Sequence, residues 1–190
     1  MKKEQFDELF QECGAVLKGH FLLTSGLHSD TYVEKFKLLQ YPRLTEKLCK
    51  EMALKFENKK PHVILGAATG GIIISHEVGR ELSVKSIFAE RVDGKLVLRR
   101  GFHIEKGDRV LVVDDVVTTG GSIYELLDLV AEYSGKVMGV GTLIDRSGDK
   151  IDFGIDYETL VRYDIPTYKP ENCPLCASNI PMTERGRTGK

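Results

Sequence analysis

The chain has no tryptophan, only six prolines and four cysteines, and no excess of charge of either sign. Its 27 Lys and Arg residues against 28 Asp and Glu residues give a formal net charge of −1 at pH 7. Bulk attraction to nucleic-acid backbones or anionic lipid is therefore not expected, and only a local basic patch could supply it. No apolar run approaches the roughly 20 residues that a membrane-spanning helix needs. Four dispersed cysteines also exclude a secreted disulfide scaffold.

The length and composition are those of an ordinary folded domain. The chain has 190 residues, of which 42% are hydrophobic and 29% are charged, and this is enough to bury a full apolar core. We expect a single domain over residues 1–190. Met1–Asp7 carries basic and then acidic and polar side chains, without the apolar stretch of a signal peptide. A cytoplasmic protein is therefore expected.

Hydrophobic periodicity predicts helices that alternate with strands. Apolar positions at helical spacing predict helices over Phe6–Cys13, Pro42 to about Asn58, Gly70–Leu82 and Ser122–Tyr133. Short apolar runs predict strands at Val63–Leu65, Ser86–Ala89, Val110–Val113, Val137–Ile144 and Thr159–Val161. This alternation is typical of an α/β fold, with a parallel sheet flanked by helices. The tail after Cys176 is rich in Gly, Arg and Thr and is expected to be frayed.

The four cysteines fall into two groups. Cys13 and Cys49 lie at apolar positions of helical patterns, where cysteine usually acts as a small buried hydrophobe. Cys173 and Cys176 form a CxxC motif, but no second CxxC or pair of histidines accompanies it. A structural or incidental role, half of a metal site and a redox pair all remain open for these two residues.

The strongest chemical signal is the run Val112–Ser122. Asp114 and Asp115 follow a buried strand, at the edge where open parallel sheets bind ligands. Adjacent side chains of an extended chain point in opposite directions, so both carboxylates can reach one ligand only if the chain turns there. Thr118–Ser122 could make that turn, and its glycines, hydroxyls and following helix would offer donors to a phosphate. These features suggest a phosphate cup beside acceptors for sugar hydroxyls.

A simpler interpretation of the same run is an acidic strand end followed by a helix N-cap at Thr119 or Ser122. It accounts for Ser122 but not for the paired aspartates. No Gly-Lys-[Ser/Thr] follows the glycines, so the run is not a Walker loop, and it does not match the GxGxxG fingerprint of dinucleotide-binding folds.

The run Val112–Ser122 resembles the signature of the type I phosphoribosyltransferases. Gly19–Val33 and Leu143–Arg146 are similar to orotate phosphoribosyltransferases, and the resemblance extends from about Phe6 to Pro170. It implies the type I fold, with a small N-terminal hood from residues 1–40 and a C-terminal tail, residues 171–190, that carries the CxxC motif. Members of this family make orotidine 5′-phosphate and pyrophosphate from orotate and phosphoribosyl pyrophosphate (PRPP), with Mg²⁺, in UMP biosynthesis.

The resemblance implies a role for each matching residue. Asp114 and Asp115 would hold the ribose hydroxyls, and the loop after them would cradle the 5′-phosphate. The residues implied in PRPP binding are Asp114, Asp115, Val116, Val117, Thr118, Thr119, Gly120, Gly121, Ser122, Thr69, Gly70 and Arg91. Those implied in orotate binding are Thr118, Arg146, Tyr32 and Thr24. Arg146 would pair with the orotate carboxylate through its planar fork. A surface ion pair with Asp145 or Asp149 remains the alternative for Arg146, and an ordinary core position the alternative for Tyr32.

The chain departs from many family members at its cations. Gly70 and Thr24 stand where many members have Lys. The stretch Glu90–His103 is equivalent to the family's mobile catalytic loop, and most of its cationic side chains are Arg instead of Lys. We expect Arg91 on pyrophosphate and Lys95 at the moving tip, because departing pyrophosphate builds negative charge. Together with Asp114 and Asp115 these are the candidate catalytic residues. Mg²⁺ is expected to arrive with the pyrophosphate, and a homodimer is expected in which the loop crosses to the neighbour's site.

Two other functions remain open. A phosphoribosyltransferase for a purine or another pyrimidine base would need the same phosphate cup. A regulatory protein of this fold could sense PRPP and bind nucleic acid. Arg146 favours a base that carries a carboxylate, and the near-neutral charge argues against nucleic acid. Orotate and PRPP are therefore the expected partners, with no nucleic acid and no membrane.

Overall fold

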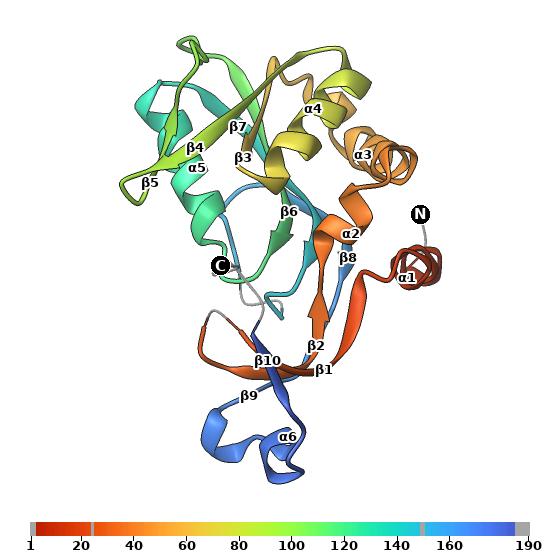
Figure 1. Cartoon of the computed structure of the whole chain (residues 1–190). Coiled ribbons are helices and arrows are strands. Elements are labelled where there is room, and N and C mark those ends of the chain that lie inside the picture. Colours follow the sequence, from red (N-terminus) through yellow and green to blue (C-terminus); the bar gives the residue numbers. More distant parts are fainter. Residues whose placement is uncertain (1–2, 24, 149–150, 185–190) are drawn as a thin grey trace.

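A six-stranded sheet forms the centre of this computed structural model, which describes residues 3–23, 25–148 and 151–184 (Figure 1). Its strand order is β5-β4-β3-β6-β7-β8, and all neighbours are parallel except the antiparallel β4–β5 hairpin. The strands are β3 (Val63–Ala67), β4 (Lys85–Val92), β5 (Lys95–Leu98), β6 (Arg109–Val117), β7 (Lys136–Asp145) and β8 (Tyr157–Arg162). The expected α/β class with a parallel sheet flanked by helices is confirmed.

Both faces of this sheet are buried, and each face has its own core. On β3 and β6, Ile64 and Leu111 pack on one side, and their neighbours Leu65 and Val112 pack on the other. This two-residue period is why these strands are continuously apolar. Figure 1 shows α3 and α4 on one side of the sheet and α5 on the other. The helices are α1 (Lys3–Glu12), α2 (Lys35–Leu39), α3 (Pro42–Phe56), which continues into η1 (Glu57–Lys59), α4 (Gly70–Leu82) and α5 (Gly121–Glu132).

A second sheet lies at the carboxyl end of the central strands and is called the hood here. It consists of β1 (Val16–Leu22), β2 (His28–Val33), β9 (Thr167–Tyr168) and β10 (Met182–Glu184), in the order β10-β1-β2-β9. The expected N-terminal hood is therefore built from both ends of the chain. Between β9 and β10 the chain forms η2 (Pro170–Asn172) and α6 (Pro174–Ala177).

The prediction of a frayed tail after Cys176 is wrong for the part that the structure describes. β10 pairs in parallel with β1, with His20 opposite Met182. The sequence Met182–Glu184 carries no strong strand pattern of its own, so its conformation depends on the edge that β1 offers. None of the helices in the described residues is long and apolar enough to span a membrane.

Candidate active site

Asp114 and Asp115 meet the first turn of α4. A Cβ built on Gly70 would lie 1.5 Å from Asp115 Oδ2, and one built on Gly71 would lie 3.3 Å from Asp114 Oδ1. Any side chain at position 70 would therefore require the Asp115 side chain to move from this position. Both carboxylates lie at the N-terminal end of α4, where the helix dipole is positive.

The chain turns at Thr118–Gly120, within the expected stretch Thr118–Ser122, and not at the aspartates themselves. β6 continues as a strand through Asp114 and Asp115 as far as Val117. The side chains come together because the first turn of α4 covers this end of β6, an arrangement that the sequence around the aspartates does not reveal. Asp115 is buried, with 2% of its surface exposed, whereas Asp114 is half-buried and accepts a hydrogen bond from the Asp115 backbone N–H at 2.9 Å.

Lys35 is a site residue that the sequence analysis missed. Its Nζ lies 2.9 Å from Oδ1 and 2.7 Å from Oδ2 of Asp115. Lys35 begins α2, directly after the hood strand β2, so this ion pair ties the hood to the central sheet. No local motif links residues 35 and 115, and only the packing of α2 near the end of β6 brings them together.

The loop between β6 and α5 leaves backbone donors at the start of a long helix. Thr118 and Thr119 are exposed, and Gly120 is the N-cap residue of α5 with a φ of +78°, a conformation that favours glycine. No side chain caps this helix, so the N-cap interpretation of Thr119 or Ser122 is not what the structure has. The first N–H groups of α5, at Gly121 and Ser122, have no partner within the helix and can bind an anion.

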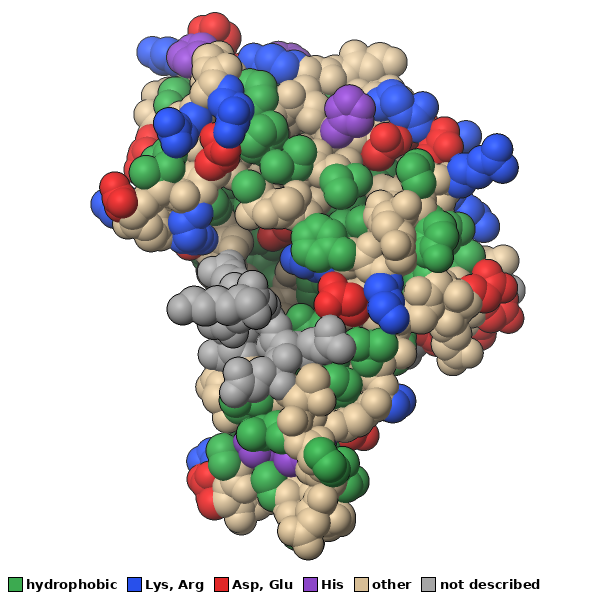
Figure 2. Space-filling model, viewed as in Figure 1, with side chains coloured by type: hydrophobic (Ala, Val, Ile, Leu, Met, Phe, Trp, Pro, Cys, Tyr) green, Lys and Arg blue, Asp and Glu red, His purple; other side chains and the backbone are tan. Residues whose placement is uncertain are grey.

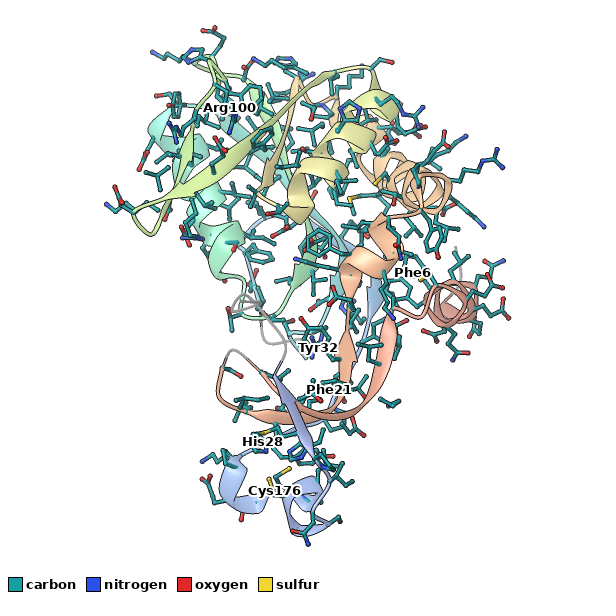
Figure 3. All side chains as sticks on the ribbon, viewed as in Figure 1. Phe6, Phe21, His28, Tyr32, Arg100 and Cys176 are labelled. Atoms are coloured by element: carbon teal, nitrogen blue, oxygen red, sulfur yellow. The ribbon has the colours of Figure 1, made fainter. Side chains whose placement is uncertain are left out.

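Arg146 and Tyr32 face each other from the central sheet and the hood. Arg146 follows β7 and donates its backbone N–H to Val117 O at 2.9 Å, which places it beside the loop that begins at Thr118. Burial lowers the pKa of the Arg146 guanidinium, while Tyr32 opposes that shift. Nε of Arg146 is buried without a hydrogen-bond partner in the described part of the chain. Figure 3 shows Tyr32 on β2, on the side of the hood toward the central sheet.

The simpler alternatives were a surface ion pair for Arg146 and an ordinary core position for Tyr32, and the structure agrees with them only in part. Asp145 pairs with Arg162 rather than with Arg146, at 3.3 Å between Arg162 Nε and Asp145 Oδ2. Asp149, the other expected partner, lies outside the described residues, as does Thr24, the fourth residue expected to contact orotate. Tyr32 does pack against an aromatic neighbour, since its ring centroid lies 5.7 Å from that of Phe21.

The expected catalytic loop, Glu90–His103, forms the β4–β5 hairpin and the segment after it, which turns at Arg100 and Gly101. Arg91 is engaged there with Glu125 of α5, through two hydrogen bonds of 2.9 Å. Arg100 makes a similar pair with Glu90, at 2.8 and 3.0 Å. Lys95 is exposed beside the hairpin turn and has no ion pair within the described residues. The expected roles of Arg91 and Lys95 stay predictions.

The remaining expected residues lie around the same end of the sheet. Thr69 is the exposed N-cap residue of α4, next to Gly70. Val116 and Val117 complete β6 between the carboxylates and the anion loop, and Val117 is buried. Figure 2 shows the surface hollowed between the central body and the hood, where acidic and basic side chains lie close together. The arrangement offers carboxylates to hydroxyls, backbone donors to a phosphate and one desolvated cation to a planar anion.

The CxxC motif lies in the hood, away from the paired aspartates. No pair of histidines was expected beside this motif. That expectation is wrong in three dimensions, because His20 and His28 lie beside Cys173 and Cys176. The cluster could not be predicted from local patterns, because the two histidines and the two cysteines lie far apart in the sequence.

The chain resembles known proteins in both sequence and fold. Residues 38–153 match the model of a phosphoribosyl transferase domain. The chain is 50% identical over 186 residues to the orotate phosphoribosyltransferase of Caldanaerobacter subterraneus subsp. tengcongensis, covering 98% of both chains. It is 44% identical over 182 residues to that of Thermotoga maritima, covering 96% of this chain and 97% of the relative. Its fold is similar to the crystal structure of orotate phosphoribosyltransferase from Aeropyrum pernix, with a TM-score of 0.69, 26% identity, and coverage of 82% of this chain and 92% of that chain.

Proposed function

The chain belongs to the orotate phosphoribosyltransferases within the phosphoribosyl transferase family, and from that membership we propose that it transfers the 5-phosphoribosyl group from PRPP to orotate. The products are orotidine 5′-phosphate and pyrophosphate, in the pathway to UMP. The observation that carries this proposal is Arg146, a desolvated guanidinium beside the anion loop, whose fork suits the carboxylate that distinguishes orotate from other bases.

The PRPP side of the site follows from the two loops at the end of the sheet. The N–H groups of Gly121 and Ser122 bind the 5′-phosphate, with the Thr118 and Thr119 hydroxyls as further donors. Asp114 and Asp115 accept hydrogen bonds from the ribose hydroxyls, and Thr69 and Gly70 line the pyrophosphate side. Lys35 holds the Asp115 carboxylate in place before substrate arrives.

The base lies between Arg146 and the hood. Tyr32 offers an aromatic face for stacking, and Arg146 pairs with the orotate carboxylate. A ring nitrogen of orotate then attacks the anomeric carbon of the ribose while the bond to pyrophosphate breaks. The ribose becomes oxocarbenium-like, and the fixed carboxylates of Asp114 and Asp115 stabilise its positive charge.

Mg²⁺ supplies charge neutralisation on the pyrophosphate when it is bound. The donor set fits a metal that arrives with substrate, since the site offers two carboxylates and one of them is already paired with Lys35. Most ligands of this Mg²⁺ would be substrate oxygens and waters, with Asp114 as the carboxylate that contacts it.

Arg91 and Lys95 act on the departing pyrophosphate from the β4–β5 hairpin. Arg91 is paired with Glu125 in this conformation. Arg91 must therefore leave Glu125 before it can contact pyrophosphate. We propose a homodimer in which the hairpin completes the neighbour's site, and a cytoplasmic location stays a prediction.

A steady-state assay with a panel of bases tests the function. Pyrophosphate release should depend on orotate and should be negligible with uracil, adenine, guanine and xanthine. Turnover with a purine in place of orotate would contradict the proposal. Binding of RNA or DNA that weakens with salt, without turnover, would instead support the regulatory alternative.

A further inference from the structure

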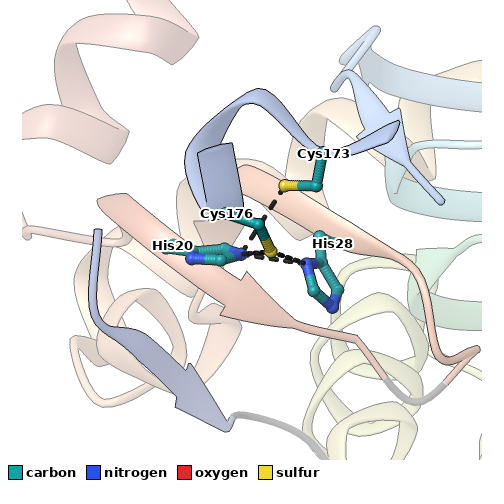
Figure 4. Close-up of side chains that lie close together, drawn as sticks. All are labelled: His20, His28, Cys173 and Cys176. Carbon is teal, nitrogen blue, oxygen red and sulfur yellow. Dashed lines mark hydrogen bonds between the residues drawn. The ribbon is translucent and has the colours of Figure 1, made fainter. Parts of the chain in front are cut away.

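His20, His28, Cys173 and Cys176 gather at one point of the hood. The four atoms that could act as ligands, two imidazole nitrogens and two sulfurs, all lie within 4.8 Å of one another. Figure 4 shows the four side chains pointing toward a common centre. His20, His28 and Cys173 are 3–5% exposed, and Cys176 is at the surface. The cluster is distinct from the site at the end of the central sheet, and none of its residues has a role there.

The distances within the cluster are close to those of a tetrahedral shell. His20 Nε2 lies 3.0 Å from His28 Nδ1 and 3.7 Å from each of the two sulfurs, and Cys176 Sγ lies 3.3 Å from His28 Nδ1. Zinc binds histidine nitrogen at about 2.0–2.1 Å and cysteine sulfur at about 2.3 Å, so the edges of such a tetrahedron measure roughly 3.3–3.8 Å. The side chains are therefore close to zinc-binding positions.

Hydrogen bonds alone account poorly for this arrangement. Nδ1 of His20 donates to Ile180 O at 2.8 Å, which leaves Nε2 with a lone pair directed into the cluster. That one lone pair faces His28 Nδ1 and both sulfurs. A single cation at the centre would bond to all four atoms at once. An imidazole whose other nitrogen donates to a backbone carbonyl is also the usual arrangement of a metal-binding histidine.

The backbone delivers these ligands from both ends of the chain. The pairing of β1 with β2 shifts between Lys18 and Phe21, and His20 lies in this irregularity, near His28 at the start of β2. Cys173 and Cys176 lie three residues apart at the start of α6, so both sulfurs are on one side of a single turn. The segment that carries them runs from β9 at one edge of the hood to β10 at the other.

We propose that His20, His28, Cys173 and Cys176 bind one structural zinc ion that fastens the C-terminal segment to the hood. Two thiolates balance the charge of Zn²⁺, and the two imidazoles bind as neutral ligands. Binding therefore releases two thiol protons to solvent, and the shell is closed because all four positions come from protein. Tetrahedral sulfur and nitrogen ligation favours zinc over the oxygen-preferring Mg²⁺ expected at the active site.

The test is metal analysis of the tag-free, full-length protein, purified under reducing conditions with zinc in the medium. Mass spectrometry of metals should find about one zinc per chain in the wild type. Cys176→Ser should weaken zinc binding by about tenfold or more in competition with a chromogenic chelator. Cys13→Ser is the matched control because Cys13 is a half-buried cysteine outside the cluster, and it should retain the zinc.

Two further measurements use only the wild type, in case the variant does not fold. Cobalt(II) should replace zinc with the visible absorption of a tetrahedral site and a charge-transfer band from thiolate. Removal of zinc by a chelator should open residues 169–184 to protease while the central sheet stays folded. Absence of zinc, retention of zinc in Cys176→Ser, or a Cys173–Cys176 disulfide in protein purified without oxygen would overturn the proposal.

Discussion

Nζ of Lys35 lies within 3 Å of both carboxylate oxygens of Asp115, at 2.9 and 2.7 Å. Lys35 is 35% exposed and Asp115 only 2%, so a buried anion depends on a half-buried cation from the neighbouring layer. The hood and the central sheet are thus joined by charge at the place where the sugar of PRPP is proposed to bind.

Replacing Lys35 tests this dependence. Lys35→Met should lower the free energy of unfolding by about 1–2 kcal/mol, because Asp115 is left without its cation, although the exposure of Lys35 keeps the loss below that of a fully buried pair. Lys55→Met is the control, since Lys55 pairs with Glu158 at an exposed position, and its loss should be under about 1 kcal/mol. Equal losses in urea unfolding would contradict a special role for Lys35.

The paired aspartates should be essential for turnover. Asp114→Asn with Asp115→Asn removes two charged acceptors that are proposed to hold the ribose. Each is worth about 1.5–3 kcal/mol, so kcat/KM should fall by roughly 10²–10⁴-fold. Orotate-dependent pyrophosphate release measures the loss, and circular dichroism checks that the fold is retained. Full activity in this double variant would sink the assignment of the site.

Arg146 should lower the stability of the folded protein while it supports activity on orotate. Burial lowers the pKa of its guanidinium, which means that the folded protein bears a cost for the charge. Arg146→Gln should therefore raise the melting temperature while lowering kcat/KM for orotate by roughly 10²-fold, with PRPP binding nearly unchanged. Arg146→Lys should not restore orotate turnover, because lysine lacks the fork. A variant that loses both stability and PRPP binding would point to a structural role instead.

The β4–β5 hairpin and the turn that follows it carry a matched pair of arginines. Arg91 and Arg100 each pair with a glutamate in this conformation, yet only Arg91 is proposed to act on pyrophosphate. Arg91→Ala should lower kcat by roughly 10²-fold or more, and Arg100→Ala should leave kcat close to that of the wild type. Similar rates for both variants would remove Arg91 from the catalytic machinery.

Asp145 makes the stability depend on acid. Burial alone would raise the pKa of Asp145, but hydrogen bonds from Ser147 and Arg162 outweigh it and hold the pKa below its usual value. The resulting stabilisation is present above the unfolded-state pKa of about 3.9 and is lost as pH falls through the lower folded pKa.

Asp145→Asn should therefore be less stable than the wild type at neutral pH, and the difference should shrink below about pH 4. Urea unfolding at a series of pH values measures this difference. A difference that stays constant across the acid range would contradict the assignment.

Local sequence patterns predicted the parts of this molecule that depend on neighbours in the chain. The strand β6 and the helix α5 could be predicted because hydrophobic periodicity is a property of adjacent residues. The phosphate-binding role of the run from Asp114 to Ser122 stays a prediction. Lys35 with Asp115, and His20 with Cys176, are joined only by tertiary packing. β10 was missed because its residues extend an existing edge rather than express a strong propensity.

The two-ended construction of the hood also sets an order of events during synthesis. Strands β1 and β2 are made first, but β9 and β10 follow all the strands of the central sheet. On the ribosome, the hood therefore remains a two-stranded hairpin, which is marginal on its own, until residues up to Glu184 have emerged. A nascent chain stopped before Thr167 would therefore carry all six strands of the central sheet but only β1 and β2 of the hood.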